Sequence, residues 1–343
     1  MSLVRSVFLR SAWRSVRRGG GGKAPVIAGH KLLHRCNLEC VMCPFWRRED
    51  ETLLGVDDEV RMMDALVRAG VSFLGFEGGE PLLRRDLPQI LAESHRRFHT
   101  SLVTNGWLLR KRADDLVPHL DLLFVSLDGI GDLHDRLRGI PGSFAKAVEG
   151  IRAVKGRVPV AISSTLTKEN LDNAEDVVAL AERLKVGVTF QVAYNYSTAG
   201  NLTPAGQKLR ETLVRLLLLK EHGAPILESR EYFTSVINSW YRGIPWRCKP
   251  WMTMNVDPQG RVVLPCYSLR EYGGGPYVWD TDVRKLWGSY HWAPYEGCNK
   301  CALACYLEPS LFRWTNPTMI RERILDPIVA YLDSGGENEA PAL

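Results

Sequence analysis

Short apolar segments alternate with helix-length amphipathic segments along residues 26–222 of this chain. Strands are predicted in six ranges, 26–33, 72–77, 100–104, 122–127, 159–166 and 188–193. Helices are expected at 57–69, 86–98, 108–116, 143–155 and 171–184, followed by a longer one at 203–222. This alternation predicts an α/β fold with a parallel sheet and right-handed crossovers. In such sheets, ligands bind beyond the carboxyl ends of the strands.

Three cysteines follow the first predicted strand, and they are Cys36, Cys40 and Cys43 at C-x3-C-x2-C spacing. Three thiolates on one short loop can hold three irons of a four-iron cluster and leave the fourth iron with an open coordination position. A partial zinc site and three unrelated thiols are the alternatives. Zinc sites usually pair such cysteines with a second Cys or His pair nearby. The next cysteine here is Cys248, so the spacing favours an iron–sulfur cluster.

The cysteine spacing resembles that of the radical S-adenosylmethionine (SAM) superfamily, and the resemblance covers most of the chain. It implies a partial (β/α)6 barrel and a [4Fe-4S] cluster on Cys36, Cys40 and Cys43, with SAM at the open iron. In such enzymes an electron from the reduced cluster cleaves SAM, and the resulting 5′-deoxyadenosyl radical removes a hydrogen atom from a substrate. The sequence does not identify a catalytic acid or base.

Polar motifs stand at the ends of several predicted strands. Gly78-Gly79-Glu80-Pro81 follows the second strand and resembles the family motif that binds the amino group of SAM. Glycines let a ligand approach the backbone closely, and Glu80 can receive an ammonium group. The resemblance implies that the next three strand ends also help to hold SAM. The candidates there are Asn105, Ser126, Asp128 and Ser164, the last with its neighbours Ser163 and Thr165. Ser126 and Asp128 are two residues apart, so on a strand they are expected to point to one side.

A second cysteine group follows, made of Cys248, Cys266, Cys298, Cys301 and Cys305. Residues 251–266 predict a β-hairpin around the turn 257–260, which would bring the first two of these cysteines together. With the C-x2-C pair that follows, the hairpin resembles the auxiliary-cluster domain called SPASM, or twitch in its shorter form. We expect a second [4Fe-4S] cluster on Cys248, Cys266, Cys298 and Cys301, with Cys305 as the alternative fourth ligand. A structural zinc site on the same thiolates is the other possibility.

The chain has 343 residues, which is enough for one large domain and a smaller one. We expect a basic segment at 1–24, a radical SAM core domain at 25–222, and a small cysteine-rich SPASM/twitch-like domain at 223–320. A C-terminal helix and tail are expected at 321–343. An auxiliary cluster with four cysteine ligands would transfer electrons, either by accepting one from a substrate radical or by relaying them from a reductant.

Composition and charge exclude several classes of protein. The net charge of +5 is modest, so no nucleic-acid partner is expected. No apolar stretch approaches the ~20 residues that span a bilayer, and a secretory signal is absent from the sequence. The cysteines follow cluster spacings rather than a disulfide framework, so we expect a cytoplasmic protein with an electron donor such as ferredoxin or flavodoxin. The basic N-terminus is either a solvated tail or a segment that contacts an anionic membrane surface.

No residue identifies the substrate. Aromatic residues near the domain boundary, among them Tyr196 and Tyr267, can line a pocket, although most are expected to be core. Few residues precede the first predicted strand, which leaves no room there for the leader-binding domain of many peptide-modifying enzymes. We therefore expect an oxidative tailoring or biosynthetic step on a small molecule, cofactor precursor or lipid, with a SPASM-type peptide maturase as the alternative. An iron–sulfur electron carrier without SAM chemistry would not need Gly78-Gly79-Glu80-Pro81.

Overall fold

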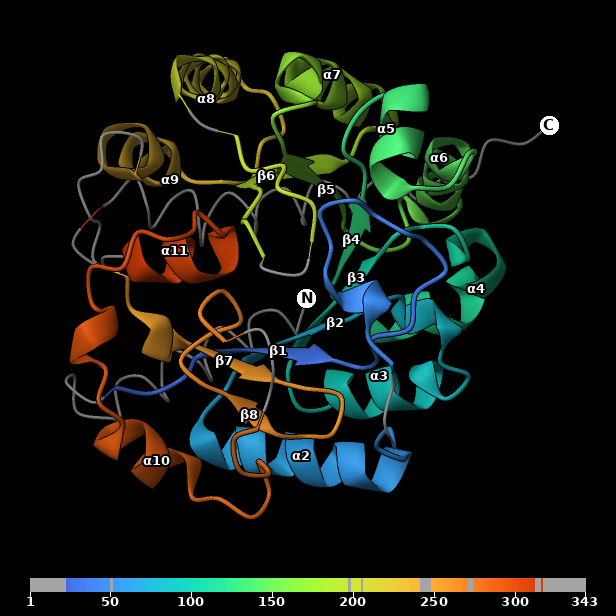
Figure 1. Ribbon diagram of the computed structural model, residues 1–343. Coiled ribbons are helices and arrows are strands. Elements are labelled where there is room, and N and C mark those ends of the chain that lie inside the picture. Colours follow the sequence, from blue (N-terminus) through green and yellow to red (C-terminus); the bar gives the residue numbers. More distant parts are fainter. Residues whose placement is uncertain are drawn as a thin grey trace.

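The structure is a computed structural model that describes residues 23–49, 52–196, 199–204, 206–240, 248–270, 274–311 and 316. Most of the predicted basic segment and the predicted C-terminal helix lie outside these residues. One eight-stranded sheet runs through the molecule in the order β6-β5-β4-β3-β2-β1-β7-β8 (Figure 1). Its parallel strands β1 to β6 are Ile27–Lys31, Phe73–Glu77, His99–Thr104, Leu122–Ser126, Val160–Leu166 and Gly187–Val192.

Helices connect the strands and cover one face of the curved sheet (Figure 1). They are α2 (Val56–Ala69), α3 (Leu87–His95), α4 (Leu109–Leu116), α5 (Asp132–Arg138), α6 (Ser143–Val154) and α7 (Ala174–Leu184). After β6 come α8 (Gly206–Glu221) and α9 (Arg230–Ser235), and the last helices are α10 (Val283–Ser289) and α11 (Ala304–Leu311). Short 3-10 turns occur at Phe45–Arg47, Pro81–Leu83, Val117–His119, Leu171–Asn173, Pro250–Met252 and Ala293–Tyr295, and a π turn at Val236–Trp240. The predicted α/β class is confirmed.

Helix α2 illustrates how the sequence specifies these elements. Acidic residues in its first turn complement the helix dipole, and Gly70 ends the helix at a φ of 96°, a conformation that glycine adopts easily. Met62, Met63 and Leu66 are fully buried in the apolar core. Burial of each such side chain contributes about 1.5–3 kcal/mol, so packing rather than propensity fixes the helix in place.

The two faces of the sheet differ in what they contact. On β2, Leu74 and Phe76 are fully buried in the core, whereas the residues that alternate with them, Phe73, Gly75 and Glu77, are only half-buried. Strand alternation places these two sets on opposite faces. We call the half-buried side, which is turned away from the helices, the inner face. Because it keeps accessible surface at the centre of the fold, it is the face on which a ligand can bind.

The predicted hairpin is present, and its two strands extend the sheet formed by β1 to β6. Strand β7 (Thr253–Val256) pairs in parallel with β1, and β8 (Val262–Val263) pairs antiparallel with β7. The Asp257 carboxylate accepts hydrogen bonds from the backbone N–H groups of Gln259 and Arg261, which closes the turn. Helix α11 lies on the open side of the sheet and contacts α9 and β7 (Figure 1). In the part of the chain that is described, no helix combines the length and the apolar character needed to cross a membrane.

Candidate active site

The first three cysteines lie on the loop that follows β1. Backbone N–H groups of Glu39 and Val41 donate to carbonyl groups at the end of α5, which pins this loop to the helix. Cys40 is buried, while Cys36 and Cys43 are half-buried. Burial raises the pKa of Cys36 to about 12, and Glu80 and the other two thiols add to the shift. Three cysteine thiols on one loop can ligate three irons of a cluster.

A half-buried cation lies beside the loop. Arg138, the last residue of α5, places Nη1 3.8 Å from the Sγ atom of Cys40 and Nε 2.7 Å from Oδ2 of Asp128. The Asp128 side chain is inaccessible to solvent. Its other oxygen accepts the backbone N–H of Thr165 at 2.8 Å. Asp128 therefore orients the guanidinium group toward a cysteine sulfur, the arrangement by which outer groups tune a metal centre.

The glycines of the Gly78-Gly79-Glu80-Pro81 motif pack against the cysteine loop itself. The N–H of Gly79 donates to the carbonyl of Leu33 at 2.8 Å. A Cβ atom at Gly79 would lie 2.1 Å from the carbonyl oxygen of His34, and one at Gly78 would lie 2.4 Å from that of Leu33. Both positions require glycine because the two backbones touch. The predicted contact of this motif with the SAM amino group stays a prediction.

Glu80 joins two strand ends beneath the loop. It is fully buried, and its carboxylate accepts hydrogen bonds from the N–H of Leu82, the hydroxyl of Thr104 and the N–H of Asn105. Burial raises the pKa of this carboxyl, and these hydrogen bonds oppose the shift. The Asn105 amide in turn donates to Asn37 at 2.9 Å and lies 3.8 Å from the sulfur of Cys36. Glu80 and Asn105 thus position the cysteine loop.

The structure places the candidates at two strand ends on different sides of the sheet. Ser164 is buried at 1% exposure between the core residues Ile162 and Leu166, so it lies on the helix-covered face, and its predicted contact with SAM stays a prediction. Alternation puts the half-buried Ser163 on the inner face instead, paired with Ser126 of β4. Strand β4 ends at Ser126, so Asp128 does not extend the inner face as expected and instead binds Arg138.

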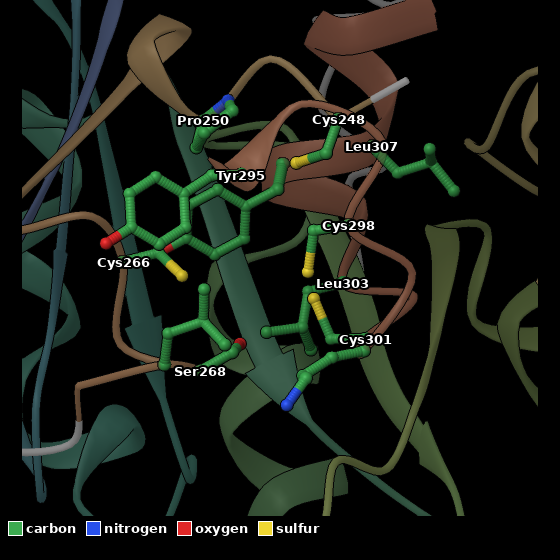
Figure 2. Close-up of a pocket in the computed structure, with 12 residues that line it drawn as sticks. Cys248, Pro250, Cys266, Ser268, Tyr295, Cys298, Cys301, Leu303 and Leu307 are labelled. Atoms are coloured by element: carbon green, nitrogen blue, oxygen red, sulfur yellow. The ribbon is translucent and has the colours of Figure 1, made fainter. Parts of the chain in front are cut away.

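Four of the later cysteines surround one cavity. Cys248, Cys266, Cys298 and Cys301 line a space of about 440 Å³, open solvent included, and Figure 2 shows their sulfur atoms directed toward it. Burial raises the pKa of Cys266 to about 12 and, with the neighbouring thiols, also raises the pKa of Cys248. A set of four facing thiols fits a fully ligated four-iron cluster. Among the described residues, no three His, Cys, Asp or Glu side chains are close enough together for a single metal ion.

Cys305 differs from these four. It does not line the cavity, and it is exposed, whereas the other four are buried or half-buried. Its carbonyl accepts a hydrogen bond from the Thr253 hydroxyl at 2.8 Å, which holds the start of α11 against the start of β7.

Charged and aromatic side chains occupy the region between the two cysteine groups. The Lys31 ammonium lies 2.9 Å from Oε1 of Glu77 and 4.2 and 4.5 Å from the ring centres of Phe45 and Tyr267. Burial raises the pKa of Tyr196, and the Glu77 carboxylate adds to it. The Tyr196 ring packs edge-on against that of Phe45, with the ring centres 5.8 Å apart. Sequence reasoning assigned no role to Lys31 or Glu77. The sequence feature that could have indicated them is that each is a charged residue at the end of an apolar strand, Lys31 on β1 and Glu77 on β2.

Comparisons with known proteins agree with this geometry. Residues 31–183 match the radical SAM superfamily, and residues 188–325 match a domain of unknown function, DUF3463. The chain is 25% identical over 295 residues to a PqqA peptide cyclase of Granulibacter bethesdensis, covering 79% of this chain and 78% of that protein. It is 30% identical over 170 residues to an Fe-coproporphyrin III synthase of Methanosarcina barkeri, covering 48% of this chain and 42% of that protein.

The fold is also similar to a crystal structure of Streptococcus suis SuiB bound to SAM. The TM-score is 0.64 at 16% identity, over 86% of this chain and 70% of that one. The superfamily match runs from the last residue of β1 into α7, and the DUF3463 match contains all five later cysteines. Residues 31–183 therefore form a domain of the radical SAM superfamily, whose enzymes use a [4Fe-4S] cluster and SAM, and a DUF3463 domain that holds the later cysteines follows it.

Proposed function

We propose that this enzyme binds SAM at a [4Fe-4S] cluster on Cys36, Cys40 and Cys43 and modifies a peptide with the radical that SAM cleavage supplies. A second [4Fe-4S] cluster is proposed on Cys248, Cys266, Cys298 and Cys301, where it exchanges electrons with the site. The observation that carries the proposal is the buried apolar cluster of Phe45, Val263 and Tyr267. Cys43 of the first group packs against it, and Tyr267 directly follows Cys266 of the second group, which supports one site between the two groups.

The residues of this chain give the site its chemical environment. The positive charge of Arg138 lies next to the sulfur of Cys40, and the Asn105 amide lies next to that of Cys36. Phe45, Val263 and Tyr267 form a buried apolar cluster against which Cys43 and Tyr196 pack. Such packing excludes water from the place where a reactive radical would form, which protects it from side reactions.

A peptide substrate is supported by the extent of the similarity to the peptide cyclase. That similarity covers 79% of the chain and so includes both halves of the fold, whereas similarity to the Fe-coproporphyrin III synthase covers 48%. The expectation of a small-molecule substrate therefore gives way to the peptide alternative. A small-molecule substrate remains the second candidate, because the Fe-coproporphyrin III synthase is 30% identical over the region it matches.

The SAM chemistry is tested with anaerobically reconstituted enzyme. With dithionite and SAM we expect 5′-deoxyadenosine, detected by liquid chromatography and mass spectrometry, and none from the Cys36→Ala/Cys40→Ala/Cys43→Ala variant. Equal amounts from the two proteins would contradict the proposal. For the substrate, short peptides encoded beside the gene are added, and a SAM-dependent mass change is expected in one of them. A change in an added small molecule but in no peptide would favour the second candidate.

A further inference from the structure

Two buried hydroxyl groups line the four-cysteine cavity, and the proposed SAM chemistry uses neither of them. They belong to Ser268 and Tyr306, which are 6% and 4% exposed. Ser268 comes two residues after Cys266, and Tyr306 lies on α11, so they reach the cavity from different parts of the chain. Figure 2 shows Ser268 among the residues that surround the cavity with the four cysteines. A buried hydroxyl needs a hydrogen-bond partner, so what these two can bond to bears on what the cavity holds.

The hydroxyl oxygen of Ser268 is buried and unsatisfied. Within the described part of the chain, no group forms a hydrogen bond of ordinary geometry with it. The Cys301 thiol shares the cavity with this hydroxyl. Burial raises the pKa of Cys301, while the backbone N–H of Leu303 and the Ser268 hydroxyl lower it. The hydroxyl therefore favours the thiolate, which is the form in which Cys301 would ligate iron.

The hydroxyl group of Tyr306 has a proton left to donate. Its oxygen accepts hydrogen bonds from the side-chain amide of Asn255 at 2.7 Å and from the backbone N–H of Tyr267 at 3.3 Å. Both of these groups are donors, so neither can accept the phenol proton. The N–H of Tyr267 belongs to the peptide group that joins it to Cys266. The phenol therefore lies beside this cysteine at the wall of the cavity.

Much of the remaining wall of the cavity is apolar. Pro250, Leu303 and Leu307 contribute to it, and Lys300, which also lines the cavity, is exposed. Solvent and salt screen an exposed charge, whereas a buried hydroxyl acts in a medium of low dielectric constant. Hydrogen bonds to the sulfur atoms of an iron–sulfur cluster are among the features that set its reduction potential. Because reduction adds negative charge to a cluster, such hydrogen bonds stabilise the reduced form more than the oxidised form.

We propose that Ser268 and Tyr306 are positioning residues that donate hydrogen bonds to sulfur atoms of the second cluster and raise its reduction potential. Ser268 donates on the side of Cys301, and Tyr306 donates on the side of Cys266. Reduction adds one electron to the cluster, and both hydroxyl protons stay on their oxygen atoms. A higher potential favours the reduced form, so the two hydroxyls suit this cluster to accept electrons. The inference rests on the second cluster of the proposed function and adds the groups that tune it.

The test is an anaerobic redox titration of the full chain, followed by electron paramagnetic resonance. The parent protein is the triple-alanine variant of the first cysteine loop, so that the signal comes from the second cluster alone. Ser268→Ala and Tyr306→Phe should each lower the equilibrium constant for reduction by about tenfold, which is about 59 mV for a one-electron couple. Ser268→Thr keeps the hydroxyl and should have a potential closer to that of the parent. The control is Ser289→Ala, which removes a hydroxyl that donates to the Lys285 carbonyl at 2.8 Å and does not line the cavity. It should leave the potential unchanged.

A second measurement detects the hydrogen bonds themselves. After exchange into D₂O, electron–nuclear double resonance of the reduced cluster should show exchangeable deuterons, and Ser268→Ala and Tyr306→Phe should each lose one of them. Unchanged potentials and deuteron signals in both variants would overturn the inference, as would a Ser268→Thr potential as low as that of Ser268→Ala.

Iron content is counted before each titration and should equal that of the parent. Loss of iron from Ser268→Ala or Tyr306→Phe would also overturn the inference, because the residue would then be needed to assemble the cluster rather than to tune it. If the parent itself binds no iron, the second cluster of the proposed function fails. Unchanged potentials in iron-loaded variants overturn only the role of the two hydroxyls.

Discussion

Replacement of Arg138 should lower the reduction potential of the cluster on the first cysteine loop. The guanidinium lies 3.8 Å from the sulfur of Cys40, and a reduced cluster carries one more negative charge than an oxidised one. Two unit charges about 4 Å apart interact by roughly 4 kcal/mol at an effective dielectric constant of ~20. Asp128, 2.7 Å from the same guanidinium, offsets part of this. A net preference of about 1–2 kcal/mol for the reduced state remains, which for a one-electron couple is about 40–90 mV.

The assay is an anaerobic redox titration followed by electron paramagnetic resonance of the reduced cluster. Arg138→Gln alone leaves Asp128 buried without its partner, a loss that typically destabilises a fold by about 3–5 kcal/mol. The informative variant is therefore Arg138→Gln combined with Asp128→Asn, which removes both charges. Arg138→Lys retains the charge without the fork geometry and should shift the potential less. An unchanged potential in the double variant would refute the claim that Arg138 acts on the cluster.

Two further predictions concern stability and loop packing. Burial raises the pKa of Glu228 to about 7, so the unfolded chain loses this proton at lower pH than the folded one. Stability should therefore fall by about 3 kcal/mol as the pH rises from about 4.5 to 7. Glu228→Gln should flatten that dependence in thermal unfolding, and an unaltered pH profile would contradict the assignment. Gly79→Ala places a Cβ atom 2.1 Å from the His34 carbonyl oxygen and should reduce the iron bound by the cysteine loop. Gly288→Ala, which meets no atom within 4 Å, should retain wild-type iron, and equal iron in the two variants would count against the packing argument.

The sequence predicted what depends on local periodicity. Six parallel strands, most of their helices and the β7–β8 hairpin follow from apolar spacing and turn residues, which act within a few neighbouring positions. Helix α5 (Asp132–Arg138), which carries Arg138, was not predicted. The pairing of β7 with β1 did not follow, because it joins residues 27–30 with residues 253–256 through hydrogen bonds that leave no trace in either segment. The sequence placed the hairpin in the predicted domain 223–320 and could not show that its first strand pairs with β1.

The sequence predicted those site residues whose proximity depends only on their spacing along the chain. Cys36, Cys40 and Cys43 share one loop in any fold, but Ser163 and Ser164 face opposite sides of β5, and only the register distinguishes them. Asp128 was predicted to contact SAM. Nothing in the sequence shows that its partner is Arg138, which lies at the end of α5. The sequence favoured Cys301 as a ligand because it forms a C-x2-C pair with Cys298, and it left Cys305 as the alternative. The structure shows that Cys301 lines the cavity and Cys305, on α11, does not.

The central claim is that two separate cysteine groups hold two clusters on either side of one site. Iron and acid-labile sulfide are counted in anaerobically reconstituted wild type, in the variant with Cys36, Cys40 and Cys43 replaced by alanine, and in the variant with Cys248, Cys266, Cys298 and Cys301 replaced. The account predicts about eight irons per chain in wild type and about four in each variant. About four irons and one zinc in wild type would contradict it.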